Sequence, residues 1–174
     1  MNLDELDTMP EAWARNLLSA CCGSRQWLDS MVERRPFGDR AGLFAAAEAA
    51  ADTMDRDAWL DAFSHHPRIG DLDTLRDRFG ARSGSWSESE QAAVGDADDT
   101  VLERLADANA RYEARFDHVF IVCASGKRAD EMLALLEARL DNEPTHELTV
   151  ASDEQRKIMR LRLDKLLAAP EGDT

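Results

Sequence analysis

Apolar residues recur every three or four positions along most of the chain, which is the spacing of amphipathic α-helices. The first helix is expected to be capped by Asp7 or Thr8, with Pro10 near its opening, and to carry apolar residues from Trp13 to Cys21. Further helices are expected at about 27–32, 42–51, 57–63, 87–94, 100–116, 132–140 and 148–166. The sequence therefore predicts an all-α fold, close to a helical bundle.

The two longest segments carry apolar stripes that predict which side chains are buried. In the segment ending at Phe116, the stripe consists of Val101, Leu102, Leu105, Ala108, Tyr112 and Phe116. In the last helix, it consists of Leu148, Ala151, Ile158, Leu161 and Leu166. A short apolar run at 119–124 is rich in β-branched residues, and periodicity does not separate a buried strand from a buried extended link there.

Composition and charge narrow the classes of function. The chain has 174 residues, enough for one domain with a real core, and a formal net charge of -14. Nucleic acids and anionic membranes are both bound through clustered Lys and Arg, so the charge disfavours both as partners. An anionic small substrate stays open if a local basic group outweighs the overall negative field.

Cysteine usage and hydropathy bear on the compartment. The three cysteines, Cys21, Cys22 and Cys123, are odd in number and form no Cys-x-x-Cys pair, which favours a reducing compartment. The first ten residues lack the apolar core of a signal peptide, and no run approaches the roughly 20 apolar residues of a membrane span. We therefore expect a cytoplasmic protein.

A His-His-Pro sequence is the first candidate for chemistry. His65 and His66 follow the apolar segment at 57–63, and Pro67 should end its helix. His66 is then expected in an extended conformation at a helix end, and Gly70 allows a sharp turn just afterwards. An imidazole fixed at a rigid break can act as a general acid or base. The alternative is a histidine that only caps the helix C-terminus, with proline as a stop signal.

Arg162 is the second candidate, because a charge is expected on an apolar face. Arg162 lies four residues after Ile158 and four before Leu166, so its side chain should fall between them. A guanidinium there is unfavourable unless it is paired or faces a polar cavity. It therefore either binds an anionic ligand, or forms a buried ion pair, or extends its charged head to solvent from the edge of the stripe.

Ser87-Glu88-Ser89-Glu90 has the pattern of a helix capping box, with Ser87 at the N-cap and Glu90 three residues later. The capping box alone accounts for Glu90. The same helix start presents backbone N–H groups and the positive end of the helix dipole, which together form an anion site. A histidine, an anion-binding helix start and an arginine could jointly handle a carboxylate substrate.

Two other classes of function are compatible with the residues. His65, His66, Asp71 and Asp73 could ligate a metal in a hydrolase, although their spacing matches no established ligand motif. The acidic surface could instead make the chain a non-catalytic helical module that binds a basic partner.

An ordered series of short motifs makes the chain resemble one known family, the OHCU (2-oxo-4-hydroxy-4-carboxy-5-ureidoimidazoline) decarboxylases, which complete urate breakdown to (S)-allantoin. The motifs are Arg35-Pro36-Phe37, His66-Pro67-Arg68-Ile69-Gly70, Ser87 with Glu90-Gln91, Asn109 with Tyr112 and Phe116, Phe120-Ile121-Val122-Cys123-Ala124, Glu137-Ala138-Arg139-Leu140 with Asn142, and Leu161-Arg162-Leu163. The resemblance covers about 2–167, so we expect a single domain over 1–174 with its core at 2–167 and a short polar tail at 170–174. One departure is Asp117, where the family has a glycine after phenylalanine.

The resemblance also implies roles for individual residues. His66, Glu90 and Arg162 match catalytic residues of the family. The matching substrate-binding residues are Pro67, Ser87, Glu88, Ser89, Glu90, Gln91, Phe120, Ile121, Val122, Cys123 and Ala124. The last five are implied to act largely through their backbone groups. The family uses no metal or organic cofactor and tends to form homodimers, so both properties are expected here.

Overall fold

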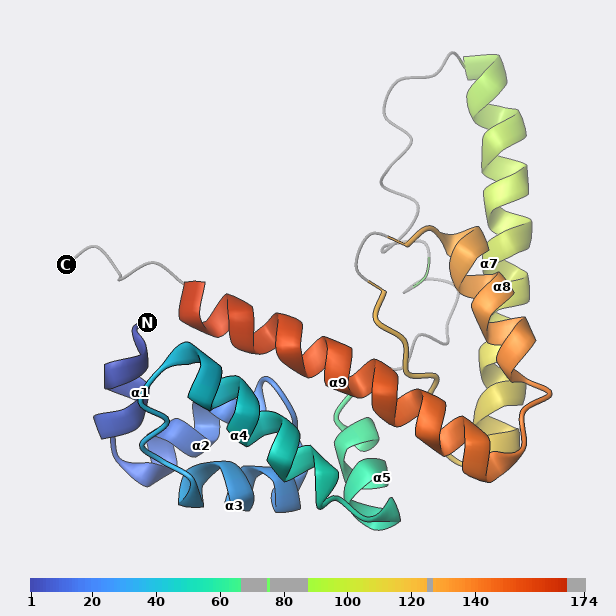
Figure 1. Cartoon of the computed structure of the whole chain (residues 1–174). Helices are drawn as coiled ribbons and strands as arrows, with labels where there is room; N and C mark the ends of the chain where they lie inside the picture. Colours follow the sequence, from blue (N-terminus) through green and yellow to red (C-terminus); the bar gives the residue numbers. More distant parts are fainter. Residues whose placement is uncertain (67–74, 76–87, 125–126, 169–174) are drawn as a thin grey trace. The chain divides into compact units, whose positions relative to one another are not determined.

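In a computed structural model of the chain, the described backbone comprises residues 1–66, 75, 88–124 and 127–168, and the side chains of 88–98 are not described. The helices are α1 (Leu3–Thr8), α2 (Glu11–Ser19), α3 (Arg25–Glu33), α4 (Arg40–Asp52), α5 (Arg56–Ser64), α7 (Glu88–Phe116), α8 (Ala129–Arg139) and α9 (Pro144–Ala168) (Figure 1). The described residues contain no β-strand. The predicted all-α class is therefore confirmed.

The backbone contacts divide the chain into two compact units. The first comprises Met1–His65 and Ser152–Thr174. Three of its helices, α3, α4 and α5, begin at side-chain caps, because Ser24, Asp39 and Asp55 each accept a hydrogen bond from an N–H group in the first turn of the helix that follows. The indole of Trp27, which is fully buried, donates to the carbonyl oxygen of Ala47 at 3.1 Å and so joins α3 to α4.

The second unit, His66–Ala151, is built around the packing of α8 along α7. The stripe predicted on α7 is buried except at Val101, which is half-buried, since Leu102, Leu105, Ala108, Tyr112 and Phe116 are all at most 6% exposed. They pack in one apolar cluster with Met132, Leu133, Leu136 and Leu140, and with Phe120 and Val122 of the segment between the helices. The run at 119–124 therefore belongs to the core of this unit, and it is a link without strand pairing in the described chain.

Three expectations about helices are corrected by the structure. Asp7 and Thr8 do not cap the helix that carries Trp13, because that helix is α2, which begins after Pro10 without a side-chain cap. They lie instead in α1, a helix that the sequence did not predict, and the Asp7 carboxylate accepts from the N–H groups of Phe37 and Gly38. The predicted break before the helix at 100–116 is absent, since α7 runs without interruption from Glu88 to Phe116. Asp99 or Thr100 was the cap expected there, but both residues are exposed within the helix, and such residues are compatible with a helix interior when they face solvent.

The third correction concerns the buried face of α9. The buried positions lie mostly four residues apart, at Ala151, Gln155, Met159 and Leu163, with Ser152 and Glu147 beside them. Ile158 and Leu166 are only half-buried, and Leu161 is 39% exposed. Apolar residues surround much of this helix, so periodicity selected a neighbouring face. Arg162 consequently lies at the edge of the buried stripe and not within it.

Candidate functional site

The end of α5 places the two adjacent histidines differently. The helix is anchored by Trp59, Ala62 and Phe63, which are at most 8% exposed, and its C-cap is His65. The N–H of His65 donates to the carbonyl oxygen of Ala62 at 3.4 Å, and its exposed ring lies 3.6 Å from the Asp61 carboxylate. The capping role that the sequence left open for His66 therefore belongs to His65.

The ring of His65 also packs against the backbone at Gly23. A Cβ atom added at Gly23 would lie 2.3 Å from Cγ of His65, so no larger residue fits there without displacing the ring. This contact fixes the chain one residue before His66, which is half-buried. Pro67 through Asp71, including the predicted ligand contact Pro67 and the turn at Gly70, lie outside the described residues.

Arg162 is held on α9 by the C-terminal end of α2. Its Nη1 donates to the carbonyl oxygen of Ala20, the C-cap residue of α2, at 3.1 Å. This is a favourable place for a cation, because the last carbonyl groups of a helix carry partial negative charge. No ion pair to Arg162 is found in the described part of the chain. A buried structural ion pair, one of the three interpretations of Arg162, is therefore not supported.

Two buried thiols lie near the Arg162 guanidinium. Burial raises the pKa of Cys21 to about 12 and that of Cys22 to about 11, and the positive charge of Arg162 partly opposes both increases. Neither thiol is a nucleophile at neutral pH, since reactivity requires the thiolate. Gln155, which is 1% exposed, lies beside the Cys22 thiol, and its side-chain contact with that thiol also opposes the increase in pKa.

The predicted anion site at the start of α7 is described only in its backbone. Glu88, Ser89, Glu90 and Gln91 lie in the first turns of the helix, and Ser87 is outside the described residues. The helix start that the sequence predicted is therefore present at the expected position. The capping box and the direction of the Glu90 side chain remain predictions.

The predicted binding segment, Phe120 through Ala124, is largely buried. Phe120, Ile121 and Val122 are at most 8% exposed, while Cys123 and Ala124 are half-buried. Side-chain donors hold two carbonyl groups of the segment. Arg139 Nη1 donates to the oxygen of Ile121, and Lys127 Nζ to that of Cys123, each at 2.8 Å. Backbone geometry in this segment therefore depends on cationic side chains from outside it.

Arg139 itself belongs to a buried polar network that was not singled out from the sequence. It pairs with the fully buried carboxylate of Glu147, which also accepts from the hydroxyl of Tyr112 and, at 2.7 Å, from the amide of Asn142. Burial, with the hydrogen bond to Glu147, raises the pKa of Tyr112. The sequence did contain a signal for Arg139, because this charged residue lies three positions after Leu136 on an apolar helix face. The same kind of signal identified Arg162.

Two further observations concern metal ligands and membrane-spanning helices. Within the described ranges, no three His, Cys, Asp or Glu side chains are grouped closely enough to hold a metal ion. None of the described helices is both long and apolar enough to cross a membrane.

Comparison with known proteins places these features in a wider group. The family model described as OHCU decarboxylase matches residues 7–164. A uric acid degradation bifunctional protein from Arabidopsis thaliana is 34% identical over 150 residues, which is 85% of this chain and 45% of that protein. The 2-oxo-4-hydroxy-4-carboxy-5-ureidoimidazoline decarboxylase from Amia calva is 30% identical over 140 residues, covering 80% of this chain and 79% of that protein. The chain thus spans less than half the length of the bifunctional relative.

Solved structures give the same correspondence in three dimensions. An OHCU decarboxylase crystallised in the presence of (S)-allantoin superposes with a TM-score of 0.69 at 31% identity, covering 92% of this chain and 99% of that one. An (S)-allantoin synthase superposes with a TM-score of 0.68 at 20% identity, covering 96% of this chain and 54% of that one, which indicates a shared fold.

Proposed function

Because the chain belongs to the OHCU decarboxylase family, we propose that it removes carbon dioxide from 2-oxo-4-hydroxy-4-carboxy-5-ureidoimidazoline and yields (S)-allantoin. The observation that carries the proposal is the extent of the match, which runs from residue 7 to residue 164 and takes in both compact units. We infer that the two units form one functional domain. The acidic chain acts on an anionic substrate, so local cations must provide the attraction that the overall charge does not.

The chemistry of the substrate makes an organic electron sink unnecessary. The carbon that bears the carboxylate also bears a hydroxyl group and adjoins a ring carbonyl or imine. When carbon dioxide leaves, the electron pair of the broken bond delocalises into that neighbouring group and gives an enolate-like intermediate. Pyridoxal or thiamine would supply the same delocalisation in other decarboxylases. The protein has to hold the substrate, stabilise the developing negative charge and control one proton.

In this proposal, Arg162 binds an anionic oxygen of the substrate and stabilises charge that develops during bond cleavage. The support for this role is its position, since Arg162 is half-buried and, among the described residues, its hydrogen bond to Ala20 occupies one of the five N–H donors of the guanidinium. The N–H groups at the start of α7, from Glu88 to Gln91, form a second anion site, to which the preceding Ser87 is proposed to contribute. Pro67 and the segment from Phe120 to Ala124 complete the contacts with the substrate.

His66 is proposed as the group that exchanges a proton, either with the substrate hydroxyl or with the new carbanion. Protonation of the carbanion on a single face would produce the S configuration. Glu90 orients either His66 or the ureido group. The anchored end of α5 supports a fixed position for His66, because the contact between His65 and Gly23 leaves little freedom immediately before it.

The assembly and the compartment are proposed on the same basis. We infer that the protein works as a homodimer in the cytoplasm, without a metal or organic cofactor.

The decisive test supplies the unstable substrate in situ. Urate oxidase and hydroxyisourate hydrolase convert urate to OHCU, and circular dichroism at increasing times then follows the formation of (S)-allantoin with and without this protein. An increase in the rate of formation of the S enantiomer is expected. If allantoin accumulates at the uncatalysed rate as a racemate, the chain is not this enzyme, and a non-catalytic helical module becomes the better explanation.

A further inference from the structure

We propose that Arg139 is a positioning residue for the substrate-binding segment, Phe120 through Ala124. Held by Glu147 and Tyr112, its guanidinium fixes the backbone at Ile121 and the ring of Phe120, and so sets the arrangement of groups that the segment offers to a ligand. The inference rests on the proposed function in one respect, since the segment is taken to bind the substrate. The geometry on which it depends lies entirely within the second compact unit.

The guanidinium of Arg139 connects four parts of this unit. It lies at the last residue of α8 and bonds to Glu147 in the first turns of α9, with the Nε–Oε1 distance at 2.9 Å. Its Nη2 also contacts the hydroxyl of Tyr112 on α7, at 3.4 Å, and its Nη1 donates to the carbonyl oxygen of Ile121 at 2.8 Å. The planar fork of arginine can make these contacts at once, whereas the ammonium of lysine cannot.

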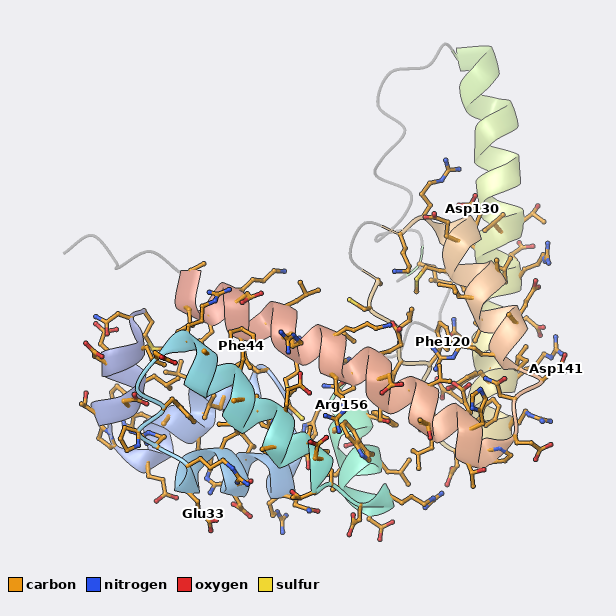
Figure 2. All side chains as sticks on the ribbon, in the orientation of Figure 1. Glu33, Phe44, Phe120, Asp130, Asp141 and Arg156 are labelled. Atoms are coloured by element: carbon orange, nitrogen blue, oxygen red, sulfur yellow. The ribbon has the colours of Figure 1, made fainter. Side chains whose placement is uncertain are left out.

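The hydrogen bond from Arg139 to the Ile121 carbonyl oxygen replaces one that a neighbouring β-strand would otherwise provide. The segment has a β-branched, apolar sequence, yet no described strand pairs with it, so its buried carbonyl groups need other donors. Arg139 supplies one donor at Ile121 and Lys127 supplies another at Cys123. The Arg139 guanidinium also lies 4.6 Å from the centre of the Phe120 ring, which is labelled in Figure 2, and this contact orients the first side chain of the segment.

The rest of the network keeps the guanidinium in place. Glu147 is fully buried and Arg139 is 8% exposed, so neither charge is screened by bulk water. One carboxylate oxygen of Glu147 accepts from Arg139 and Tyr112, and the other accepts from the Asn142 amide at 2.7 Å. Because the carboxylate is fully occupied by these donors, Arg139 cannot turn away from Ile121 without leaving a buried charge unpaired.

A purely structural ion pair between α8 and α9 is the competing explanation, and it predicts a different response to mutation. If the pair only stabilises the unit, then any weakening of the network should lower the melting temperature and leave ligand binding in the folded protein unchanged. If Arg139 positions the segment, then its own replacement should affect ligand binding more than an equally destabilising change elsewhere in the network.

Asn142→Ala is the matched control for Arg139→Lys in the full-length protein. Asn142 donates to the second carboxylate oxygen of Glu147, and in the described part of the chain its side chain makes no hydrogen bond to the segment, so its removal perturbs the same carboxylate from the other side. Tyr112→Phe is a second test variant that keeps the ring and deletes the hydroxyl, which contacts Arg139 and donates to Glu147. Each variant is assayed for melting temperature, for KM and kcat with OHCU generated in situ, for the Kd of (S)-allantoin, and for hydrogen exchange of the amides from Phe120 to Ala124.

For Arg139→Lys we expect KM and the Kd of allantoin to rise about tenfold with kcat changed less than about threefold, which is the pattern of lost ground-state binding. Amide exchange in the segment should accelerate, and Tyr112→Phe should change in the same direction by a smaller factor. Asn142→Ala should lower the melting temperature only. The proposal would be overturned if Arg139→Lys and Asn142→Ala, at the same loss of melting temperature, changed KM and amide exchange in the segment equally. If Arg139→Lys does not fold, Tyr112→Phe decides, and an unchanged KM with unchanged amide exchange in the segment would overturn the proposal.

The same experiment separates the two proposals. Absence of turnover in the wild-type protein rejects the proposed function, and hydrogen exchange then decides the positioning role without any substrate. Normal wild-type turnover with exchange in the segment unaffected by Arg139→Lys rejects the positioning role alone.

Discussion

The two histidines at the end of α5 show how neighbouring identical residues acquire different roles. His65 is the C-cap of the helix, its ring lies beside Asp61, and it covers the backbone at Gly23. These contacts account for His65 as a structural residue. His66 begins the other compact unit and is half-buried, so a role in proton transfer stays assigned to it as a proposal.

Replacing each histidine by asparagine tests this division of roles. His66→Asn should lower the rate by roughly 100-fold, because asparagine cannot transfer a proton. His65→Asn should lower the melting temperature slightly and retain most of the activity. The pH profile of the wild-type rate should contain a limb due to an imidazole, and that limb should persist in His65→Asn. Similar losses of rate in both variants, measured on folded protein, would contradict the assignment.

Arg162 is predicted to matter for turnover more than for stability. Arg162→Lys keeps the charge but loses the planar, bidentate contact, so most activity should disappear while the fold is kept. Arg162→Met removes one hydrogen bond to the Ala20 carbonyl, which costs about 1 kcal/mol and lowers the melting temperature by about 2–4 °C. No gain in stability is expected from the apolar side chain, because Arg162 lies at the edge of the buried stripe of α9 and not within it.

Arg160→Met provides the matched control on the same helix. Arg160 is exposed and bonds to Glu48 at 2.9 Å, next to Arg156, which is labelled in Figure 2 and bridges the same carboxylate to Asp52. Its loss should leave turnover unchanged. A fall in melting temperature that corresponds to about 3–5 kcal/mol for Arg162→Met, with specific activity intact, would indicate a structural ion pair instead of a catalytic residue.

At the scale of elements, the end of α7 contains a conformation that its residue does not favour. Asp117 follows Phe116, the last residue of the helix, and has a φ of 59°. Its N–H still donates to the carbonyl oxygen of Glu113 at 2.9 Å, as in α-helices that end in one residue of left-handed conformation. Glycine is the usual residue at such a position, because it has no Cβ to oppose a positive φ. The departure from the family pattern seen in the sequence therefore coincides with local strain.

Asp117→Gly should relieve this strain and stabilise the protein. The expected gain is about 0.5–1 kcal/mol, since the steric relief exceeds the entropy that glycine loses on folding. Thermal denaturation should show a melting temperature about 2–4 °C higher per kcal/mol gained. Asp117→Ala is the control, because it retains a Cβ and should give no such gain. A lower melting temperature for Asp117→Gly than for wild type would mean that the aspartate side chain stabilises the turn.

At the scale of the whole molecule, the proposed reaction needs no metal. The proposed electron sink is part of the substrate, so cleavage of the carboxylate bond does not require one from the protein. Activity should therefore survive prolonged dialysis against a strong chelator, measured in the coupled allantoin assay. Stoichiometric zinc or iron in the purified protein, with activity that disappears on its removal and returns on its addition, would refute the cofactor-free reaction and favour the His65/His66 metal hypothesis.

The sequence by itself determined the helical class, most helix positions and the buried stripe of α7, because these depend on local periodicity and on Pro, Gly and capping residues. It also identified the family through the order of short motifs. Only the tertiary structure decided which face of α9 is buried, because several faces of that helix carry apolar residues and long-range packing selects one. The partners of Arg162 and Arg139 were decided in the same way, since Ala20, Glu147 and Ile121 meet these guanidinium groups only after the helices have packed.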